Sequence, residues 1–509
     1  MNVPERRVVV IGAGIGGVIA AALLARQGRQ VVLVEQGPGA GGYVHAFTRG
    51  PYTIDPAVHS LVDQGLYEGL LAYLGVRDRC ELIPLDDAHH VLGPGVDFRA
   101  PLGLEAYVEA HVAACPAEAD AVRAFLGICE QVHREGHELP MRLPLRDLDE
   151  HAARYPTLFR YRKATLADVL DETISDPRAR YACSVSSIVL GLPPSRLSFS
   201  TFAQAVFSAV TAGEFIVQGG LQKLVDALVA GLEASGGVLR TGKRATRIGV
   251  RDGGVTGVEL DDGEWLPAGA VVSNADVTRT FGELLDPDAV PADVARRLER
   301  LTCAVSAFEL FVAIEQDLGR SGLAHLTFVS NSLDLETAYG RQMVGRASSL
   351  GLYLPTIVDG TLAPEGHSVL TGVFTTSRHP GQPWRDLKAA ALEDAMVLVD
   401  RAIPGFRDGL VFAEAATPET LERYTGNRDG SIYGWENTPA STANRRPPQK
   451  TPIRGLYLAG HWTQPGAGFL RALCSGIYAA ELIAQDDPDG GLAAFHPPQI
   501  PPLSSIGQG

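Results

Sequence analysis

The sequence contains little cysteine, and its cysteines are scattered. The 509 residues include six cysteines that form no C-x-x-C pair: Cys80, Cys115, Cys129, Cys183, Cys303 and Cys474. This spacing excludes a disulfide framework and a cysteine-type zinc site, so we expect a reducing, cytoplasmic compartment. His133 and His137 stand one helical turn apart without a third ligand, which indicates a solvated helix face and no metal site.

The sequence also lacks an excess of positive charge. The formal net charge is −15, and the sequence contains no cluster of Lys and Arg that would form a basic stripe. Because phosphate groups require clustered Lys and Arg, we expect no nucleic-acid partner. The same charge opposes electrostatic attraction to an acidic membrane, so any membrane contact would have to be hydrophobic.

No apolar run is long enough to cross a bilayer, which needs about 20 residues. Arg6 and Arg7 precede an apolar run from Val8 to Leu24 that mimics a secretory signal. Four glycines interrupt this run, and a strand, a glycine turn and a helix explain every residue in it. We therefore expect no cleaved signal and no transmembrane helix.

The glycines near the N-terminus form a G-x-G-x-x-G pattern between a predicted strand, Arg6–Ile11, and a helix from Ile15 to about Gln27. A second strand, Gln30–Glu35, ends in an acid 18 residues after Gly17. In this arrangement the glycines allow the tight turn, the approach of a pyrophosphate and close helix packing, while the acid binds a ribose hydroxyl. The unit predicts dinucleotide contacts from Gly12, Gly14, Ile15, Gly16, Gly17, Glu35 and Gln36.

A second glycine pair and a second such unit favour FAD over NAD. Gly41-Gly42-Tyr43 follows the acid, where a plain NAD site would begin its next helix. Near the other end, the strand Gly455–Gly460 leads through a glycine-rich loop into an apolar helix from about Phe469 to Ala484. Two such units suit one long cofactor, with further predicted contacts from Gly41, Gly42, Tyr43, Gly460, His461, Gly468, Phe469 and Leu470.

With these motifs the sequence resembles the phytoene desaturase-like flavoproteins, which include carotenoid desaturases, carotenoid isomerases and retinol saturase. The resemblance is strongest in Arg7–His59, Gln218–Asp276 and Thr417–Ile483. It implies an α/β fold of the amine-oxidase and phytoene-desaturase type: a discontinuous Rossmann-type FAD-binding domain and an α+β substrate domain. The implied segments are 1–99, 218–290 and 425–487 for the FAD domain and 100–217 and 291–424 for the substrate domain. The tail at 488–509 is rich in proline and glycine, so we expect it to be disordered.

Two departures from the family pattern lie near the flavin by analogy. Tyr43 stands where many amine-oxidase-type relatives have Arg, and His461-Trp462 stands where relatives often have an acid or a small residue. His45, His59 and His461 are the candidate acid/base residues, with a purely structural role as the alternative for each. Arg471 is a candidate contact to the cofactor, with a salt-bridged or solvated arginine as its alternative.

The stretch Tyr181–Val210 is apolar and carries few charges. Because relatives take lipid substrates from membranes, it is the candidate for a tunnel mouth or a peripheral contact with the inner face of the membrane. The alternative is a pair of helices buried in the core.

The resemblance implies an FAD-dependent oxidoreductase that acts on CH–CH or C=C bonds of a long apolar isoprenoid or polyene, by desaturation, cis–trans isomerisation or saturation. One alternative is a flavin amine or amino-acid oxidase, which would need an aromatic pair at the flavin and a carboxylate-binding arginine; Trp462 and Tyr433 could supply the aromatics. Another is a non-catalytic prenyl-lipid-binding relative of the Rab GDP-dissociation inhibitor type, against which the intact glycines and Glu35 speak.

Overall fold

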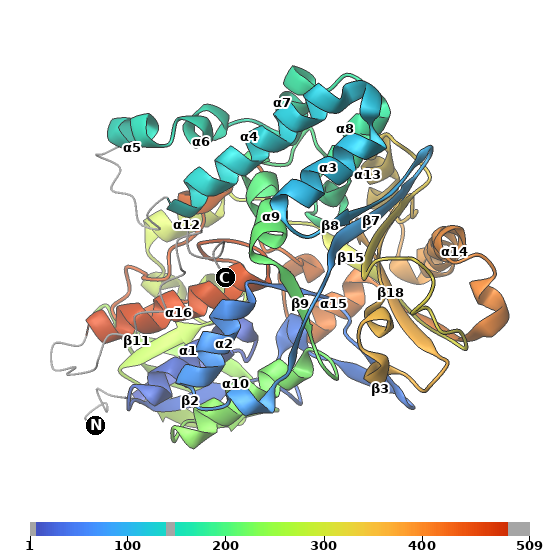
Figure 1. Ribbon diagram of the computed structural model, residues 1–509. Helices are drawn as coiled ribbons and strands as arrows, with labels where there is room; N and C mark the ends of the chain where they lie inside the picture. The colour runs from blue at the N-terminus through green and yellow to red at the C-terminus, as the bar shows by residue number, and fades with distance from the viewer. Residues whose placement is uncertain (1–6, 139–147, 487–509) are drawn as a thin grey trace.

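The computed structural model describes residues 7–138 and 148–486, and a five-stranded parallel sheet occupies one half of it (Figure 1). The strands run in the order β10-β2-β1-β14-β20, and all neighbours are parallel. Their short β-branched runs are typical of strands buried on both faces. Widely separated parts of the chain supply them: β1 (Arg7–Ile11), β2 (Gln30–Val34), β10 (Val238–Arg240), β14 (Ala270–Ser273) and β20 (Leu456–Leu458).

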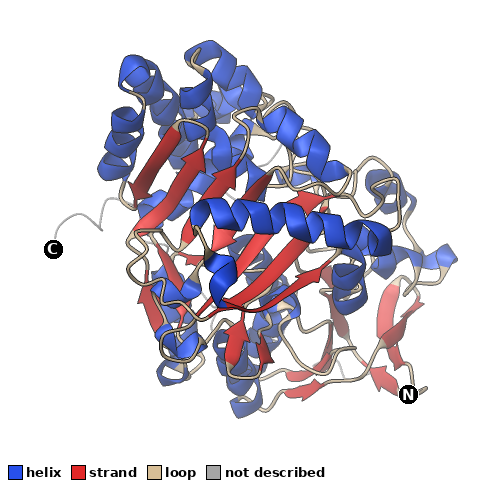
Figure 2. Cartoon of the chain, turned by 90° about the vertical axis from the view of Figure 1, so that its right-hand side faces the viewer, coloured by secondary structure: helices blue, strands red, loops and turns tan. Residues whose placement is uncertain are grey.

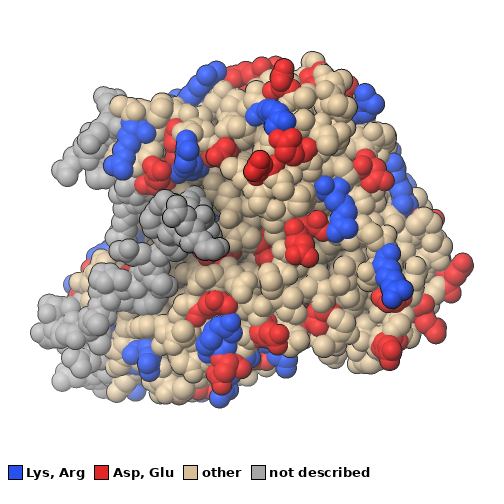
Figure 3. Space-filling view, in the orientation of Figure 1, with Lys and Arg blue, Asp and Glu red and all other residues tan. Residues whose placement is uncertain are grey.

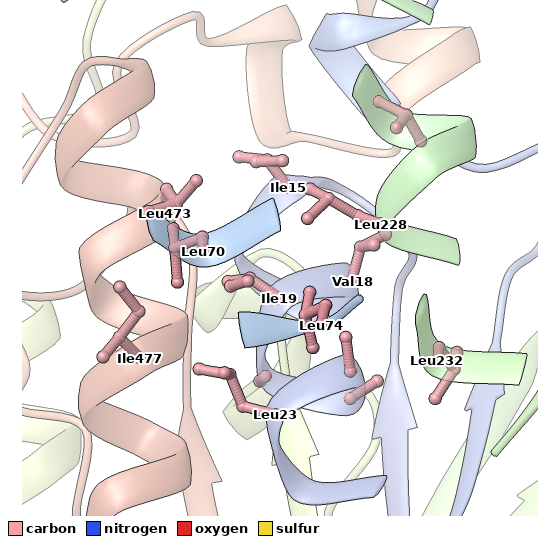
Figure 4. Packing of buried hydrophobic residues seen from close by; sticks show 14 of the residues in the cluster. Ile15, Val18, Ile19, Leu23, Leu70, Leu74, Leu228, Leu232, Leu473 and Ile477 are labelled. Atoms are coloured by element: carbon pink, nitrogen blue, oxygen red, sulfur yellow. The ribbon is translucent and has the colours of Figure 1, made fainter. Parts of the chain in front are cut away.

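One face of this sheet is covered by helices from four parts of the chain. Helix α1 (Ile15–Arg26) is buried along almost its whole length, so apolar neighbours surround it. It packs between α16 (Phe469–Gln485) and α10 (Gln222–Ala234), with α2 (Gln64–Tyr73) beside them (Figure 4). The helices predicted to begin at Ile15 and Phe469 are present, and the structure places them side by side.

The opposite face carries an antiparallel sheet of three strands, β11 (Ala245–Arg251), β12 (Gly254–Leu260) and β13 (Trp265–Pro267). Ile248 and Val258 of this sheet share a core cluster with Val9 and Val271 of the parallel sheet. The turn between β11 and β12, at Asp252-Gly253, has two consecutive positive φ angles, 52° and 71°. This is the backbone that a tight two-residue hairpin requires.

The second half is built on a seven-stranded mixed sheet with the order β19-β15-β18-β17-β16-β7-β8. Helix α14 (Trp384–Ala402) lies across one face and contacts β16 and β17 (Figure 2). The strands are β7 (Asp87–Gly93), β8 (Val96–Pro101), β15 (Ser306–Ile314), β16 (Leu326–Ser330), β17 (Ser349–Tyr353), β18 (Ser368–Thr376) and β19 (Leu410–Ala416). The hairpin β7–β8 therefore joins strands of the predicted substrate domain, although the predicted boundary at residue 99 assigns most of it to the FAD domain.

A helical layer covers the β7–β8 end of that sheet (Figure 1). Phe202, Phe207 and most other apolar side chains between Tyr181 and Val210 are buried in its core, as the core-helix alternative expects. The apolar residues of this stretch that remain partly exposed are Ile188–Leu190 and, on α9, Ala205, Val206 and Ala209. The layer consists of α3 (Leu104–Ala114), α4 (Ala119–Glu138), α6 (Pro156–Tyr161), α7 (Leu166–Thr173), α8 (Pro177–Ser184) and α9 (Phe199–Ala212).

Smaller elements join the two halves. A sheet of three short strands has the order β5-β9-β6, and a hairpin joins β3 to β4. Their bounds are β3 (Phe47–Arg49), β4 (Tyr52–Ile54), β5 (Leu61–Val62), β6 (Leu82–Pro84) and β9 (Glu214–Val217). In the part of the chain that is described, no helix is long and apolar enough to span a bilayer. The predicted disordered tail at 488–509 lies outside the described residues.

Candidate functional site

A cavity of about 660 Å³ lies where elements of the two large sheets meet. One wall comes from the β1–α1 turn, the end of β2 and the first turn of α16; the other comes from β15, β17 and β18. Of the residues predicted to bind FAD, those that line it are Gly12, Gly14, Ile15, Gly16, Glu35, Gln36, Gly41, Gly42, Tyr43, Gly460, His461, Gly468 and Phe469. Gly17 and Leu470 are predicted contacts that do not line it.

The glycine turn between β1 and α1 has the geometry that its sequence pattern predicts. Gly12 adopts a φ of +90°, which favours glycine. A Cβ on Gly17 would lie 2.0 Å from the Gly12 carbonyl oxygen, so only glycine allows this close packing. Gly14 is the N-cap of α1 and no side chain caps the helix. The first backbone N–H groups of α1 therefore remain available to an anion in the cavity.

Glu35 ties the glycine turn to the end of β2. One carboxylate oxygen accepts the Ala13 N–H at 2.8 Å, and the other accepts the Gly37 N–H at 2.7 Å. Each oxygen keeps a second lone pair for a ligand hydroxyl, so the acid can hold the loop and bind a ribose at the same time.

The second glycine pair packs directly on the first glycine turn. The Gly41 N–H donates to the Ala13 carbonyl at 2.8 Å. A Cβ on Gly42 would lie 3.2 Å from Gly14 Cα, and Gly42 has a φ of +59°. The chain after β2 therefore returns to the first glycine turn, where the sequence predicts the pyrophosphate of an extended dinucleotide.

Asn274, which follows β14, completes this end of the cavity. A Cβ on Gly16 or Gly460 would lie 2.7 or 2.8 Å from its Oδ1 atom. That oxygen is buried and has no hydrogen-bond partner among the described residues. An unsatisfied acceptor beside a cradle of glycines fits a bound cofactor that supplies donors. Asn274 was not predicted as a site residue, although the motif around it was recognised.

Tyr43 and His461, each of which directly follows a glycine of the glycine-lined wall, lie together in the cavity lining. Their ring centroids are 6.0 Å apart, and the Tyr43 hydroxyl donates to the Ser431 carbonyl at 3.0 Å. Burial raises the pKa of Tyr43 and lowers the pKa of His461 to about 3. Both side chains are therefore neutral at pH 7. Trp462, by contrast, is buried and its Nε1–H donates to Asn427, so it does not line the cavity.

Arg446 holds the loops that carry these residues. It is fully buried, and its guanidinium donates to the carbonyls of Tyr433, His461 and Trp435 and to Asn437 Oδ1. Burial lowers the pKa of Arg446 to about 9, so it stays charged at pH 7. The sequence gives no sign of this role, because Arg446 belongs to an ordinary Arg-Arg pair.

His59 lines the cavity on the side of the seven-stranded sheet. Its ring stacks on Tyr353 with 3.8 Å between centroids, and the His325 Nε2–H donates to its carbonyl at 2.9 Å. Burial and His325 lower the pKa of His59 to about 3, so this imidazole is neutral. A catalytic role for His59 or His461 stays a prediction. A neutral buried imidazole can accept a proton or a hydrogen bond, but it does not act as an imidazolium acid at pH 7.

His45 and Arg471 lie apart from the cavity lining. His45 Nδ1 is 2.7 Å from the Gly42 carbonyl, which is the local loop role of the structural alternative. Arg471 donates to Gln204 at 3.3 Å, in the contact between α16 and α9. Neither residue is brought to the cavity with the others, and their predicted roles remain untested.

Glu309 is a cavity residue that the sequence analysis missed. It lies within β15, a strand whose nine residues are all buried, and it lines the cavity with Ala307. Burial raises the pKa of Glu309 to about 8. A lone acid inside the apolar run SAFELFVAI is the pattern that could have revealed it.

Comparison with known proteins agrees with this geometry. A family model for flavin containing amine oxidoreductases matches residues 15–484. Prolycopene isomerase 2 of an Oncidium hybrid cultivar is 27% identical over 95% of this chain and 84% of its own length. All-trans-zeta-carotene desaturase of Myxococcus xanthus is 28% identical over 98% and 96%. The lycopene-forming phytoene desaturase of Pseudescherichia vulneris is 28% identical over 94% and 99%.

Solved structures share the fold. Cyclohexylamine oxidase from Brevibacterium oxydans has a TM-score of 0.65 and 18% identity over 95% of this chain and 99% of that one. Putrescine oxidase bound to putrescine has a TM-score of 0.64 and 15% identity over 94% and 99%. The predicted fold class, FAD as cofactor and the resemblance to phytoene desaturases are confirmed. The chain belongs to the flavin containing amine oxidoreductase family and is an FAD-dependent oxidoreductase.

Proposed function

We propose that this enzyme acts on CH–CH or C=C bonds of a long apolar isoprenoid or polyene. The relatives described above are named for phytoene, zeta-carotene and prolycopene, and they match almost the whole chain. Desaturation is our first candidate reaction, cis–trans isomerisation the second and saturation the third.

The observation that carries this proposal is the character of the cavity wall opposite the glycine turn. The lining residues of β15, β17 and β18 that the structure describes include no lysine or arginine. They are Ala307, Glu309, Tyr353, Val373 and Thr375. Such a wall accommodates an apolar chain and offers no cation for a carboxylate.

FAD would be held by the glycine turn, Glu35, Gly41-Gly42 and the Gly460 loop, and it supplies hydride transfer when bound. The residues of this chain then have three tasks. The first turn of α1 binds phosphate, the His59–Tyr353 pair provides a flat surface against which a polyene can lie, and the buried loops around His461 exclude water. None of these tasks requires an ionised side chain at the reacting carbon atoms.

An amine oxidase is the competing function because cyclohexylamine oxidase and putrescine oxidase share the fold. At 15–18% identity these structures support the fold alone. The proposed aromatic pair is incomplete, since Tyr433 lines the cavity and Trp462 does not. We expect no hydrogen peroxide from a panel of amines and amino acids, and its release would reverse our choice.

The test of the main proposal is incubation of the purified protein with liposomes that carry phytoene, zeta-carotene or prolycopene, with the flavin either oxidised or reduced. Chromatography with mass spectrometry separates the three reactions: desaturation removes two hydrogen atoms, isomerisation keeps the mass and saturation adds two. No conversion of any polyene, or a non-isoprenoid ligand in extracts of the protein, would contradict the proposal.

We also propose that the protein collects its substrate by peripheral contact with a membrane, through the partly exposed Ile188–Leu190. Val189 lines the cavity, so this segment connects the surface with the site. On the face that Figure 3 shows, acidic and basic side chains are dispersed without a large patch of one sign, as a hydrophobic mode of contact would allow. Failure of lipid vesicles to pull down the protein at moderate salt would remove this proposal.

A further inference from the structure

Glu309 is the only charged residue in β15, and its position in the strand points its side chain into the cavity. Side chains alternate along a strand, so Ala307 and Glu309 face one side and Phe308 and Leu310 the other. Phe308 and Leu310 belong to the core beneath α14, while Ala307 and Glu309 line the cavity. The position of the carboxyl group therefore follows from the register of the strand and not from a flexible loop.

Among the described residues, no cation compensates the Glu309 carboxyl group. Glu309 is paired with Val373 on β18 and Ala416 on β19, neither of which has a polar side chain. The Tyr43 hydroxyl faces the same region but donates to the Ser431 carbonyl. Arg49, beside β19, is bound to Glu414. Glu309 itself is 2% exposed, and its Oε2 has no hydrogen-bond partner among the described residues.

A group in this position keeps its proton, because an ionised carboxylate without a partner is strongly disfavoured in an apolar environment. The raised pKa of about 8 agrees with that reasoning. A protonated carboxyl has one O–H donor, and a buried donor without an acceptor is itself unfavourable. A molecule that fills the cavity relieves this cost only if it brings an acceptor atom to Glu309.

We propose that Glu309 presents a neutral carboxyl O–H to an acceptor atom of the molecule that fills the cavity. The acceptor is a carbonyl oxygen, a hydroxyl oxygen or a ring nitrogen. It has two sources, the flavin ring of the cofactor or an oxygen on an otherwise apolar substrate. In the second case the inference rests on the proposed function and narrows it to oxygenated isoprenoids.

The protonation state is tested first, by infrared difference spectroscopy of the holoenzyme at pH 7. The wild type minus Glu309→Gln spectrum should contain the C=O stretch of a protonated carboxylic acid. Glu214→Gln is the matched control, since burial also raises the pKa of Glu214 to about 8 but this residue does not line the cavity. A carboxylate band in place of the acid band would overturn the proposal.

The source of the acceptor is tested with Glu309→Leu, which removes the donor, and Glu309→Gln, which keeps one. If the flavin is the acceptor, the leucine variant shifts the flavin absorption bands and midpoint potential, while the glutamine variant stays near the wild type. If the substrate is the acceptor, the flavin is unchanged and the leucine variant loses about tenfold in its preference for a polyene alcohol or aldehyde over the parent hydrocarbon. The Glu214→Gln control should change neither readout.

The proposal is overturned if the leucine variant folds, binds flavin and matches the wild type in flavin spectrum, potential and substrate preference. That result is distinct from failure of the proposed function. The acid band of Glu309 and the flavin spectrum of the leucine variant can both be measured in a protein that converts no polyene. The two proposals can therefore fail independently.

Discussion

At the scale of single residues, the site depends on polar groups that are buried without a charged partner. Arg446 donates four hydrogen bonds, three to carbonyl oxygens and one to Asn437, and it accounts for the mutual position of the Tyr433–Asn437 segment and His461. Because the acceptors are mostly backbone atoms, another residue of similar size cannot satisfy them.

We expect Arg446→Met to destabilise the protein by about 3 kcal/mol or more, because several buried carbonyl groups lose their donor. The cavity loops should loosen with it, so the purified variant should contain less flavin. Urea unfolding and the ratio of flavin to protein absorbance measure the two effects. Arg445→Met, at the exposed neighbouring position, is the control and should behave like the wild type; equal stability of both variants would contradict this account.

Glu35 gives a second prediction at this scale. In Glu35→Gln one carboxylate oxygen becomes an NH₂ group that must face a backbone N–H, at Ala13 or Gly37. The charge-assisted bonds are lost, and we expect FAD affinity to fall about tenfold or more. Titration of the apoprotein with FAD, followed by flavin fluorescence, measures this. Glu233→Gln on the exposed face of α10 should leave the affinity unchanged.

The glycines and Glu35 were predictable because their sequence spacing dictates their geometry within one β-α-β unit. Asn274 and Glu309 were not, since each acquires its role from segments distant in sequence. Arg446 was not predictable either, although its acceptors lie only 9 to 15 residues away, because they belong to irregular loops that no sequence pattern marks. Glu309 came closest to detection, as an acid in a strand pattern that predicts complete burial.

At the scale of elements, the contact between α1 and α16 joins the two glycine loops that line the cavity. A Cβ on Gly476 would lie 2.1 Å from the Gly16 carbonyl oxygen, and one on Gly16 would lie 2.8 Å from the Ala472 carbonyl. The two helices therefore cross with their backbones nearly in contact. Position 476 requires glycine because any Cβ would collide with the backbone of α1.

Gly476→Ala should force the helices apart, with a loss of about 1–3 kcal/mol from overpacking and a lower flavin content. Gly340→Ala is the matched control, because Gly340 also lies in a helix, α13 (Leu335–Met343), and its Cβ would meet nothing within 4 Å. The control should be neutral or slightly stabilising, since alanine favours helix. Thermal unfolding of both variants checks this, and equal melting temperatures would show that the helix crossing tolerates a methyl group.

The elements around the glycine motifs followed from local periodicity, including the helices that begin at Ile15 and Phe469 and the strands β1 and β2. The hairpin β7–β8 did not. Its first strand contains Asp87, His89 and His90, which hide the apolar alternation, and it is stabilised by parallel pairing with β16 more than 200 residues away. That pairing also explains why the predicted boundary at residue 99 does not coincide with the edge of a sheet; the division into domains stays a prediction.

At the scale of the whole molecule, buried histidines and buried acids have opposite effects on the way stability changes with pH. Burial lowers the pKa of six histidines to about 3 or 4, well below the unfolded value of about 6.5: His59, His89, His111, His133, His325 and His461. Burial raises the pKa of Asp55 to about 7 and those of Glu214 and Glu309 to about 8.

These shifts predict a stability maximum near pH 6.5. Below that pH these histidines bind protons in the unfolded chain but stay neutral in the folded protein. The free energy of unfolding therefore falls as the pH decreases. Above it the three acids bind protons in the folded state but not in the unfolded chain, so stability falls as pH rises toward 8. Melting temperatures from pH 4.5 to 8.5 test the curve. Glu214→Gln should flatten its alkaline side, and a melting temperature that rises steadily to pH 8 would contradict the prediction.

The strands of the parallel sheet are far apart in the sequence, so they are also synthesised at very different times. The glycine turn after β1 leaves the ribosome first, but β20 and α16, the helix that packs on Gly16, are made last. At about 5–20 residues per second, the roughly 420 residues between β2 and β20 take about 20 to 80 s to translate. During that interval the apolar α1 lacks its partner α16, so we expect the nascent chain to expose this apolar surface to chaperones and to complete the glycine-lined cavity only when synthesis ends.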